Sequence, residues 1–189
     1  MEDNDNQWDP NFKEAIKLVF KHEGVFSDDP NDHGGPTQYG ISLRFLKDLP
    51  KELGDINHDG AVNIDDVKSL TRGGAMLLYY KEFWCPLNLA AIRHPWVAVK
   101  VFDMAVTMGV KRAAMLLQRA FNDVSPIFHL AVDGKIGPKS IDAINCINAE
   151  NLLKAFQERC TEFYRTIVRY DASQSKWLKG WLNRVYSYS

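Results

Sequence analysis

The chain has 189 residues, of which 46% are hydrophobic and 25% charged, and this composition is typical of a globular protein rather than a disordered one. The formal net charge of −1 excludes a global basic field that would attract nucleic acid or anionic lipid. No stretch approaches the ~18 consecutive apolar residues of a membrane-spanning helix. We therefore expect a monomer that has neither nucleic acid nor a membrane as its partner.

The start of the chain and its cysteines both bear on where the protein is made. The first residues, MEDNDNQWDP, are acidic and polar, the opposite of the basic and then apolar start of a secretory signal peptide. Cys85, Cys146 and Cys160 lie in helical, apolar contexts and are expected to be buried, reduced thiols. These features predict a protein without a signal peptide, made in a reducing bacterial cytoplasm.

Helical patterns dominate the chain. Apolar residues recur at helical spacing over residues 11–24, turn residues fill 25–41, and a second helix is expected over 42–49, capped by Ser42. Further helices are expected over residues 64–71, 74–84, 96–109, 110–123, 138–146, 149–170 and 174–185, with a break at Arg72-Gly73-Gly74. The predicted class is mainly α, with a small irregular or β-containing lobe after the first helix. Since no repeat or linker interrupts the pattern, residues 1–189 are expected to form a single compact domain.

Glu23 stands at the end of the first expected helix, on its apolar stripe. Phe12, Ile16, Val19 and Glu23 follow one another at spacings of 4, 3 and 4, which places them on one helix face. Partial desolvation there raises the pKa of a carboxyl group, and so does the negative end of the helix dipole. A carboxyl group that keeps its proton near neutral pH can serve as a general acid. The alternative is a solvated or paired surface residue.

The segment that follows could supply the rest of a hydrolytic site. It contains aspartates at positions 28, 29 and 32, and a hydroxyl at Thr37 that could orient a water molecule. Cleavage of a bond between two sugars requires a protonated acid for the leaving oxygen and a carboxylate or positioned water on the other face. The alternative is a turn whose Asp, Asn, Gly and Pro residues satisfy their own backbone.

Residues 22–42, HEGVFSDDPNDHGGPTQYGIS, resemble the N-terminal signature of the glycoside hydrolase 108 lysozyme-like family, which includes phage endolysins and bacterial muramidases. Further matching blocks follow in order: DVKSLT, YYKEFW, VFDMAV, LLQRAFN, VDGKIGPKS and GWLNRV. The resemblance runs from about Phe12 to Val185. It implies a lysozyme-like helical fold, with a catalytic lobe over about residues 10–87 and a helical peptidoglycan-binding region over about residues 88–186.

The resemblance also implies an activity and its residues. Members of this family are N-acetylmuramidases that hydrolyse the β-1,4 bond between N-acetylmuramic acid and N-acetylglucosamine in bacterial peptidoglycan, with no cofactor for catalysis. The catalytic glutamate of the family maps onto Glu23. The wider lysozyme-like order of Glu, Asp and Thr suggests Asp32 and Thr37 as its catalytic partners, and Asp29 is the competing choice for the second carboxylate.

Two further residues are candidates for substrate binding, and two others depart from the family pattern. Tyr39 lies in the same run as Glu23, and Asp103 lies in the VFDMAV block. Val25 replaces the usual second glycine after the catalytic glutamate, and Thr107 replaces an asparagine that often follows the VFDMAV block. Thr107 thus puts an amide contact with substrate at that position in doubt.

Residues 55–66, DINHDGAVNIDD, match the spacing of an EF-hand calcium loop with glycine at its sixth position. The ligands expected at positions 1, 3, 5, 7, 9 and 12 are Asp55, Asn57, Asp59, the Ala61 carbonyl, Asn63 and Asp66. The last position usually holds glutamate, and aspartate there is typical of dockerin-type loops. A structural Ca²⁺ is therefore predicted. The alternative is an Asx-rich turn that caps the helix starting near Ile64.

The last third of the chain offers candidate wall contacts. Residues 132–140, VDGKIGPKS, resemble the VDGxxGPxT turn of peptidoglycan-binding repeats, although a turn between two helices explains them equally well. Trp177, Trp181 and Tyr186 could stack on sugars, but their helical spacing favours the core.

Two functional hypotheses follow from these observations. The first is a phage-type endolysin, made in the host cytoplasm and released to the cell wall by a holin or a similar route. The second is a non-catalytic, calcium-dependent cell-wall-binding or secretion-accessory module.

Overall fold

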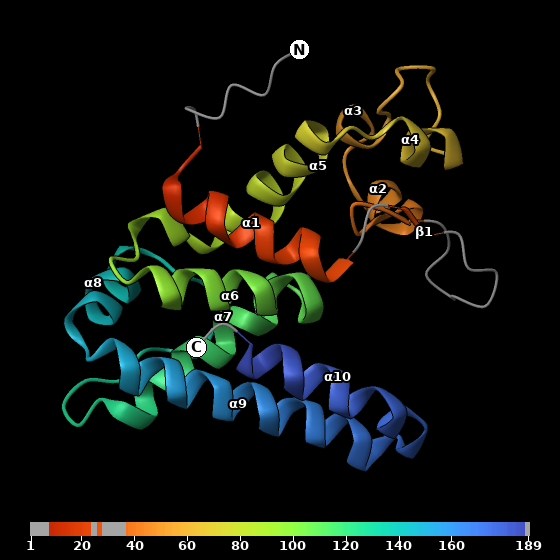
Figure 1. Cartoon of the computed structure of the whole chain (residues 1–189). Helices are drawn as coiled ribbons and strands as arrows, with labels where there is room; N and C mark the ends of the chain where they lie inside the picture. Colours follow the sequence, from red (N-terminus) through yellow and green to blue (C-terminus); the bar gives the residue numbers. More distant parts are fainter. Residues whose placement is uncertain (1–7, 24–25, 28–36, 188–189) are drawn as a thin grey trace. The chain divides into compact units, whose positions relative to one another are not determined.

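The computed structural model describes residues 8–23, 26–27 and 37–187, which fall into two units (Figure 1). The first unit contains Trp8 and the described residues of 16–80, and the second contains residues 9–15 and 81–187. Helix α1, Pro10–Glu23, contributes residues to both. That the two units form the single compact domain expected from the sequence stays a prediction.

The first unit combines a small antiparallel sheet with short helices. The sheet has the order β1-β2-β3, formed by β1 (Phe26–Ser27), β2 (Thr37–Gln38) and β3 (Ile41–Ser42). The helices that follow are α2 (Leu43–Asp48), α3 (Lys51–Gly54), α4 (Ile64–Ser69) and α5 (Arg72–Tyr79). Its core is apolar and includes Ile16, Val19, Ile41, Leu46, Val67, Leu70 and Tyr79. The small β-containing lobe predicted after the first helix is thereby confirmed.

Side-chain caps set the starts of two of these helices. The Ser42 hydroxyl accepts a hydrogen bond from the Phe45 amide at 3.1 Å, as its predicted capping role requires. Thr71 caps α5 in the same way by accepting from the Gly74 amide at 3.1 Å. The break expected between α4 and α5 exists, but it lies at Leu70-Thr71 instead of Arg72-Gly73-Gly74, because the latter residues form the first turn of α5.

The second unit is built from helices. After the π-helical turn Tyr80–Trp84 and the short 3-10 turns Cys85–Leu87 and Leu89–Ala91 come α6 (Pro95–Met108), α7 (Val110–Val124), α8 (Pro138–Cys146), α9 (Ala149–Tyr170), the 3-10 turn Ala172–Gln174 and α10 (Ser175–Tyr186). Helix α9 packs against α6, α7 and α10. These bounds agree with the sequence prediction to within one or two residues, and the mainly α class is confirmed.

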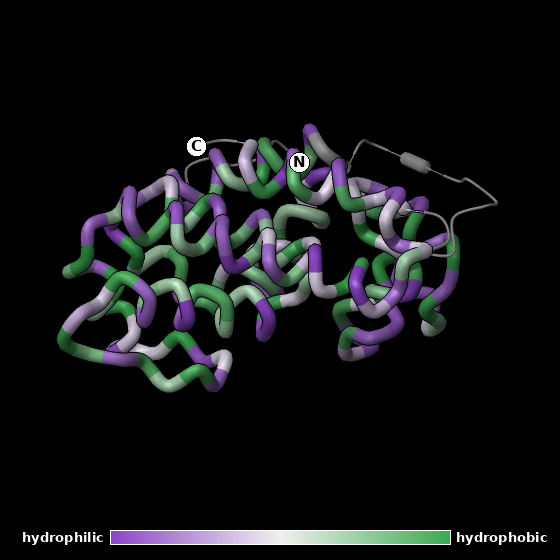
Figure 2. The backbone as a smooth tube through the Cα atoms, turned by 90° about the horizontal axis from the view of Figure 1, so that it is seen from below, coloured by the Kyte–Doolittle hydropathy of each residue, from purple (hydrophilic) through white to green (hydrophobic). Residues whose placement is uncertain are grey.

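Aromatic packing secures the start of α1 within this unit. Phe12 meets Trp84 and Phe102 edge-on, with ring centroids 5.4 and 5.7 Å apart. The rings of Trp84 and Phe102 are themselves 5.5 Å apart, and all three side chains are buried. Along the helical turns, hydrophobic and hydrophilic residues alternate (Figure 2), as expected for helices that each bury one face.

Several side chains are more exposed than the sequence predicted. Cys160 is buried, but Cys85 and Cys146 are exposed free thiols, so their expected burial is wrong. Trp177 and Tyr186 are 54% and 50% exposed, which also contradicts the core placement favoured by their spacing. The reason is that α10 lies at the edge of the unit and packs mainly on α9 and the turn before it.

None of the described helices combines the length and apolarity that a membrane-spanning helix requires.

Candidate active site

Glu23 is the last residue of α1, at the end of a buried stripe. Phe12, Ile16 and Val19 are each at most 1% exposed, which confirms the inward face that the sequence predicted for this helix. The side chain of Glu23 lies outside the described part of the structure, and so do Asp29 and Asp32. Their catalytic roles stay predictions.

The small sheet places Thr37 beside the segment that leaves α1. Ser27, four residues after Glu23, pairs with Thr37 in the antiparallel register of β1 and β2, and Thr37 pairs with Ser42 on its other side. Thr37 is thus half-buried and held on the central strand, and none of the described residues is a hydrogen-bond partner of its hydroxyl.

A tight turn follows Thr37 and orients Tyr39. Tyr39 and Gly40 have φ angles of 53° and 78°, and two successive positive φ values in a two-residue hairpin loop are typical of a type I′ turn. The ring of Tyr39 packs on Phe20 of α1 with a centroid distance of 5.6 Å. The Tyr39 ring is therefore half-buried and packs against α1. Its predicted contact with the substrate stays a prediction.

Residues that the sequence analysis did not single out hold this hairpin in place. The Tyr79 hydroxyl donates to the Tyr39 carbonyl at 3.1 Å, and the Tyr79 ring lies 6.1 Å from that of Phe20. The Gln38 amide donates to the Leu70 carbonyl at 2.9 Å. Tyr79 is the first residue of the YYKEFW block, and this match to the family was the signal in the sequence that could have indicated it. Spacing alone did not indicate that its partner is Tyr39, 40 residues earlier.

The loop of residues 55–66 folds around its own carboxylates. Asp66 is fully buried and accepts hydrogen bonds from the amides of Ile56 at 2.7 Å and Asn63 at 2.7 Å. Asp55 is 8% exposed and accepts from the amides of Asp59 at 3.1 Å and Gly60 at 2.9 Å. Burial raises the pKa of Asp66, but these backbone donors more than offset it and hold the pKa below its usual value.

This loop has the donor chemistry for Ca²⁺ but uses it here for hydrogen bonds. Asp55, Asp59 and Asp66 supply hard oxygens at the positions that an EF-hand loop requires. Among the described residues, however, no three carboxylate, thiol or imidazole side chains converge closely enough to hold a metal ion. Asn63 and Asp66 also form a capping box on α4. The capping of α4 by this loop is thereby confirmed, and the predicted Ca²⁺ stays a prediction.

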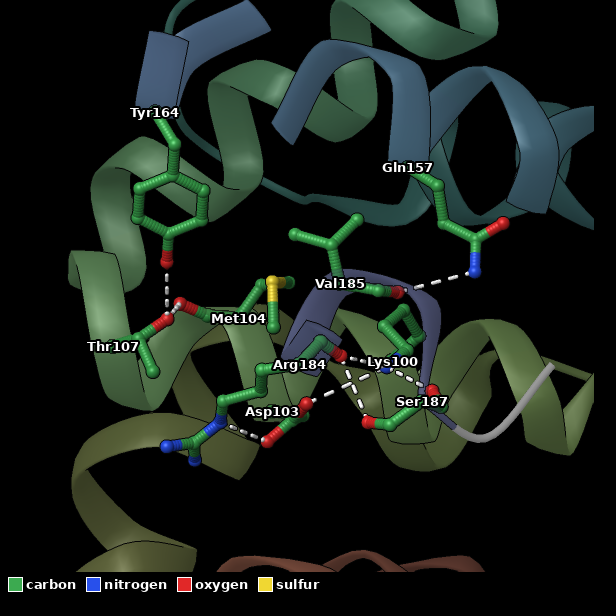
Figure 3. A network of polar contacts seen from close by, with 9 residues as sticks. All are labelled: Lys100, Asp103, Met104, Thr107, Gln157, Tyr164, Arg184, Val185 and Ser187. Atoms are coloured by element: carbon green, nitrogen blue, oxygen red, sulfur yellow. Dashed lines mark hydrogen bonds and ion pairs between the residues drawn. The ribbon is translucent and has the colours of Figure 1, made fainter. Parts of the chain in front are cut away.

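Asp103, the other predicted substrate contact, lies in the second unit and is fully buried (Figure 3). Its carboxylate accepts from Arg184 Nε at 2.8 Å and lies 3.5 Å from the ammonium of Lys100, which is also fully buried. Lys100 donates in addition to the carbonyls of Arg184, at 2.9 Å, and Ser187. The structure thus gives Asp103 two internal cationic partners, which tie α6 to the end of α10.

Burial affects the ionisation of Lys100. Desolvation lowers the pKa of Lys100, and the nearby Asp103 carboxylate opposes the effect.

Nearby, Thr107 exchanges a hydrogen bond of 2.9 Å with the hydroxyl of Tyr164 and donates to the Met104 carbonyl at 3.0 Å. Thr107 therefore serves the packing of α6 on α9 in this structure.

Two family models match successive parts of the chain and meet at the junction of α6 and α7, whereas the two structural units divide between Tyr80 and Lys81. Residues 16–109 match the family model described as Glycosyl hydrolase 108. They belong to that family. Residues 112–186 match the model described as Predicted Peptidoglycan domain. The chain is thus a glycoside hydrolase of lysozyme-like type that degrades peptidoglycan, and peptidoglycan is its partner.

A solved structure supports the fold. The chain superimposes on the structure of Brucella abortus SagA with a TM-score of 0.67 and 23% identity, over 94% of this chain and 95% of that one. At 23% sequence identity, this similarity shows only that the two proteins share a fold. Among proteins with curated descriptions, none matches the chain.

We predict that Asp103→Asn destabilises the protein by roughly 3–5 kcal/mol, because it leaves the fully buried Lys100 without the carboxylate beside it and removes a charged partner of the half-buried Arg184. Thermal and urea unfolding at neutral pH measure the effect. The matched control is Asp123→Asn, since Asp123 pairs with Arg159 at the surface and should cost at most about 1 kcal/mol. Equal losses in the two variants would show that the buried pair is not required.

Proposed function

We propose that the protein is an N-acetylmuramidase that hydrolyses the β-1,4 bond between N-acetylmuramic acid and N-acetylglucosamine, with Glu23 as general acid. The observation that carries the proposal is the position of Glu23. It ends the buried stripe of α1, and the strand pairing of Ser27 with Thr37 brings the Thr37 hydroxyl, which has no hydrogen-bond partner among the described residues, back toward the same segment. This local arrangement lies within the region that matches the glycosyl hydrolase family.

The proposed reaction needs a proton on one side of the bond and a water molecule on the other. Glu23 donates its proton to the glycosidic oxygen as the bond between that oxygen and the anomeric carbon breaks. A water oxygen forms the new bond to the anomeric carbon and loses a proton to a carboxylate, for which Asp32 and Asp29 are the candidates. Thr37 accepts or donates a hydrogen bond to orient this water. No cofactor takes part.

We predict that Glu23→Gln lowers muralytic activity by roughly 10²–10⁴-fold, because the amide cannot donate the required proton. Mass spectrometry of products from purified peptidoglycan measures it, and wild-type products should end in reducing N-acetylmuramic acid. Glu14→Gln, on the exposed face of the same helix, serves as the matched control and should retain full activity.

Circular dichroism establishes that the Glu23→Gln protein is folded before its activity is compared. A folded variant that releases products at the wild-type rate contradicts the role of Glu23. A wild-type protein that binds peptidoglycan without releasing reducing ends supports the alternative, a non-catalytic wall-binding module.

Thr37 gives a second test of the site. We predict that Thr37→Val, which keeps the shape but removes the hydroxyl, lowers the turnover number by roughly five- to tenfold, as expected for the loss of one hydrogen bond in the transition state. Thr37→Ser restores the hydroxyl and should recover most of the activity. Equal activity of the valine and serine variants would exclude a role for this hydroxyl.

We also propose that the loop of residues 55–66 binds a structural Ca²⁺ through the oxygens of Asp55, Asn57, Asp59, Asn63 and Asp66 and the carbonyl of Ala61. What supports this is the full twelve-residue spacing together with two buried carboxylates, at Asp55 and Asp66, that make no salt bridge with any described residue. The ion would supply positive charge to these oxygens and fix the loop before α4.

We predict that Ca²⁺ added to chelator-treated protein raises the melting temperature by roughly 5 °C at saturation, with binding heat in calorimetry. Asp59→Ala removes an exposed ligand and should abolish both effects. Asp65→Ala is the matched control, because Asp65 stands in the same loop outside the ligand positions and pairs with Lys68. Without heat or a thermal shift in the wild type, the loop is a capping turn alone.

A further inference from the structure

A cavity of about 550 Å³ lies in the second unit, between the connection from α7 to α8 and the start of α8. Phe128, Leu130, Ala131 and Pro138 contribute an apolar wall. Asp133, Lys135, Lys139 and Ser140 are among its polar lining residues. Apolar walls with a few placed polar groups are typical of sites that bind small molecules or peptides.

Amide side chains on α7 fix the shape of this cavity. Asn122 donates to the Leu130 carbonyl at 2.9 Å and accepts from the Leu130 amide at 2.7 Å. One turn earlier, the buried Gln118 donates to Asp133 at 2.8 Å and accepts from the Gly134 amide at 2.9 Å. The connection is therefore held rigidly against α7, and a ligand would not have to order it.

Gly134 lets the connection lie this close to α7. Its φ of +76° is accessible to glycine, and a Cβ atom there would lie 2.8 Å from the side chain and 3.1 Å from the carbonyl of Lys111. A larger residue would push the connection away from Gln118 and distort the cavity wall.

The start of α8 has backbone amides that can donate to a ligand. Gly137 caps the helix without a side-chain hydrogen bond, and Pro138 in the first turn has no amide hydrogen. The amides of Lys139 and Ser140 therefore have no acceptor within the helix. Partial positive charge at a helix N-terminus favours carboxylates and phosphates.

Ser140 adds a hydroxyl group at this end of the cavity. The residue lines the cavity, is 8% exposed, and makes no side-chain hydrogen bond with any described residue. Its hydroxyl can therefore donate a hydrogen bond to a bound ligand. The exposed ammonium of Lys139 also has no salt bridge among the described residues, so it too can bind an anion.

Asp133 adds a negative charge to the same cavity. Its carboxylate accepts hydrogen bonds from Gln118 at 2.8 Å and from the Lys135 amide at 2.9 Å. The bond from Gln118, followed by that from Lys135, lowers the pKa of Asp133, so it is ionised at neutral pH. The site therefore disfavours a polyanion and suits a ligand that carries both carboxylate and ammonium groups.

We propose that this cavity binds the peptide stem of peptidoglycan, with a stem carboxylate at the start of α8 near Ser140 and Lys139. Asp133 then faces an amino group of the stem, and the alanine methyl groups lie on the apolar wall. The glycan backbone itself offers no amino group of this kind. The proposal rests on peptidoglycan as the substrate under the proposed function, and it adds which part of the polymer the second unit recognises.

The test uses the full chain and a synthetic stem pentapeptide, L-Ala-γ-D-Glu-L-Lys-D-Ala-D-Ala, as the probe. Calorimetry should detect binding to the wild type, and Lys135→Glu/Lys139→Glu should weaken it roughly tenfold or more, because charge-assisted contacts are lost or reversed. Lys179→Glu on α10 makes the same kind of charge change at a residue outside the cavity and should keep the wild-type affinity. Circular dichroism checks that each variant is folded.

Three results overturn the proposal. The first is a wild-type protein that does not bind the pentapeptide, and the second is unchanged binding by the double variant. The third is stronger binding of a glycerol phosphate oligomer than of the peptide, which would assign the cavity to a different anion. Release of reducing ends from purified peptidoglycan is measured in parallel, so a hydrolase that ignores the peptide refutes this inference while the proposed function stands.

Discussion

The contact of Phe20 with Tyr39 and Tyr79 is the interaction on which the arrangement of the first unit depends. Two-residue strands cannot hold their own position, because an isolated hairpin of this length is marginal in water. Phe20 lies one turn before Glu23, so the ring that packs the hairpin also belongs to the helix end that carries the predicted acid. The aromatic contact, the Tyr79 hydrogen bond and the bond from Gln38 together turn a weak sheet into a fixed support for Thr37.

The carboxylates of this chain have different roles because their surroundings differ. Asp66 is buried but satisfied by backbone amides, so it stabilises a loop and a helix start. Asp103 is buried against Lys100 and Arg184, where the cost of desolvating three charges is repaid only while all three are present. Asp133 remains at the wall of a cavity, where its charge is open to a ligand. A carboxylate in a sequence pattern thus indicates chemistry only after its hydrogen-bond donors are known.

The helices were largely predictable, because their signals are local. Helix α8 begins at Pro138 and α9 ends at Tyr170 as apolar periodicity and the flanking turn residues indicated. Errors arose where a distant partner decides the outcome. The error at Arg72-Gly73-Gly74 was local instead, because Thr71 accepts the Gly74 amide and so starts a helix at residues that read as a break. The burial of Asp103 depends on Arg184, 81 residues later, and no spacing rule connects the two. For the same reason the sequence indicated Glu23 by its helix phase but missed Tyr79, whose role is set by contacts across the fold.

Peptidoglycan is a polymer, and this gives a physical reason for joining the two regions in one chain. A stem held by one part of the protein keeps the attached glycan at a high effective concentration for the other part, without any change in the chemistry of cleavage. Such tethering favours a rigid, weakly charged recognition site over a strongly basic one, because a basic surface would also bind the other anionic polymers of a cell wall. The net charge of −1 and the presence of both Asp133 and lysines in the cavity lining meet this requirement. Selectivity for the stem would then come from the placement of opposite charges, while affinity would come from the number of stems that the wall presents.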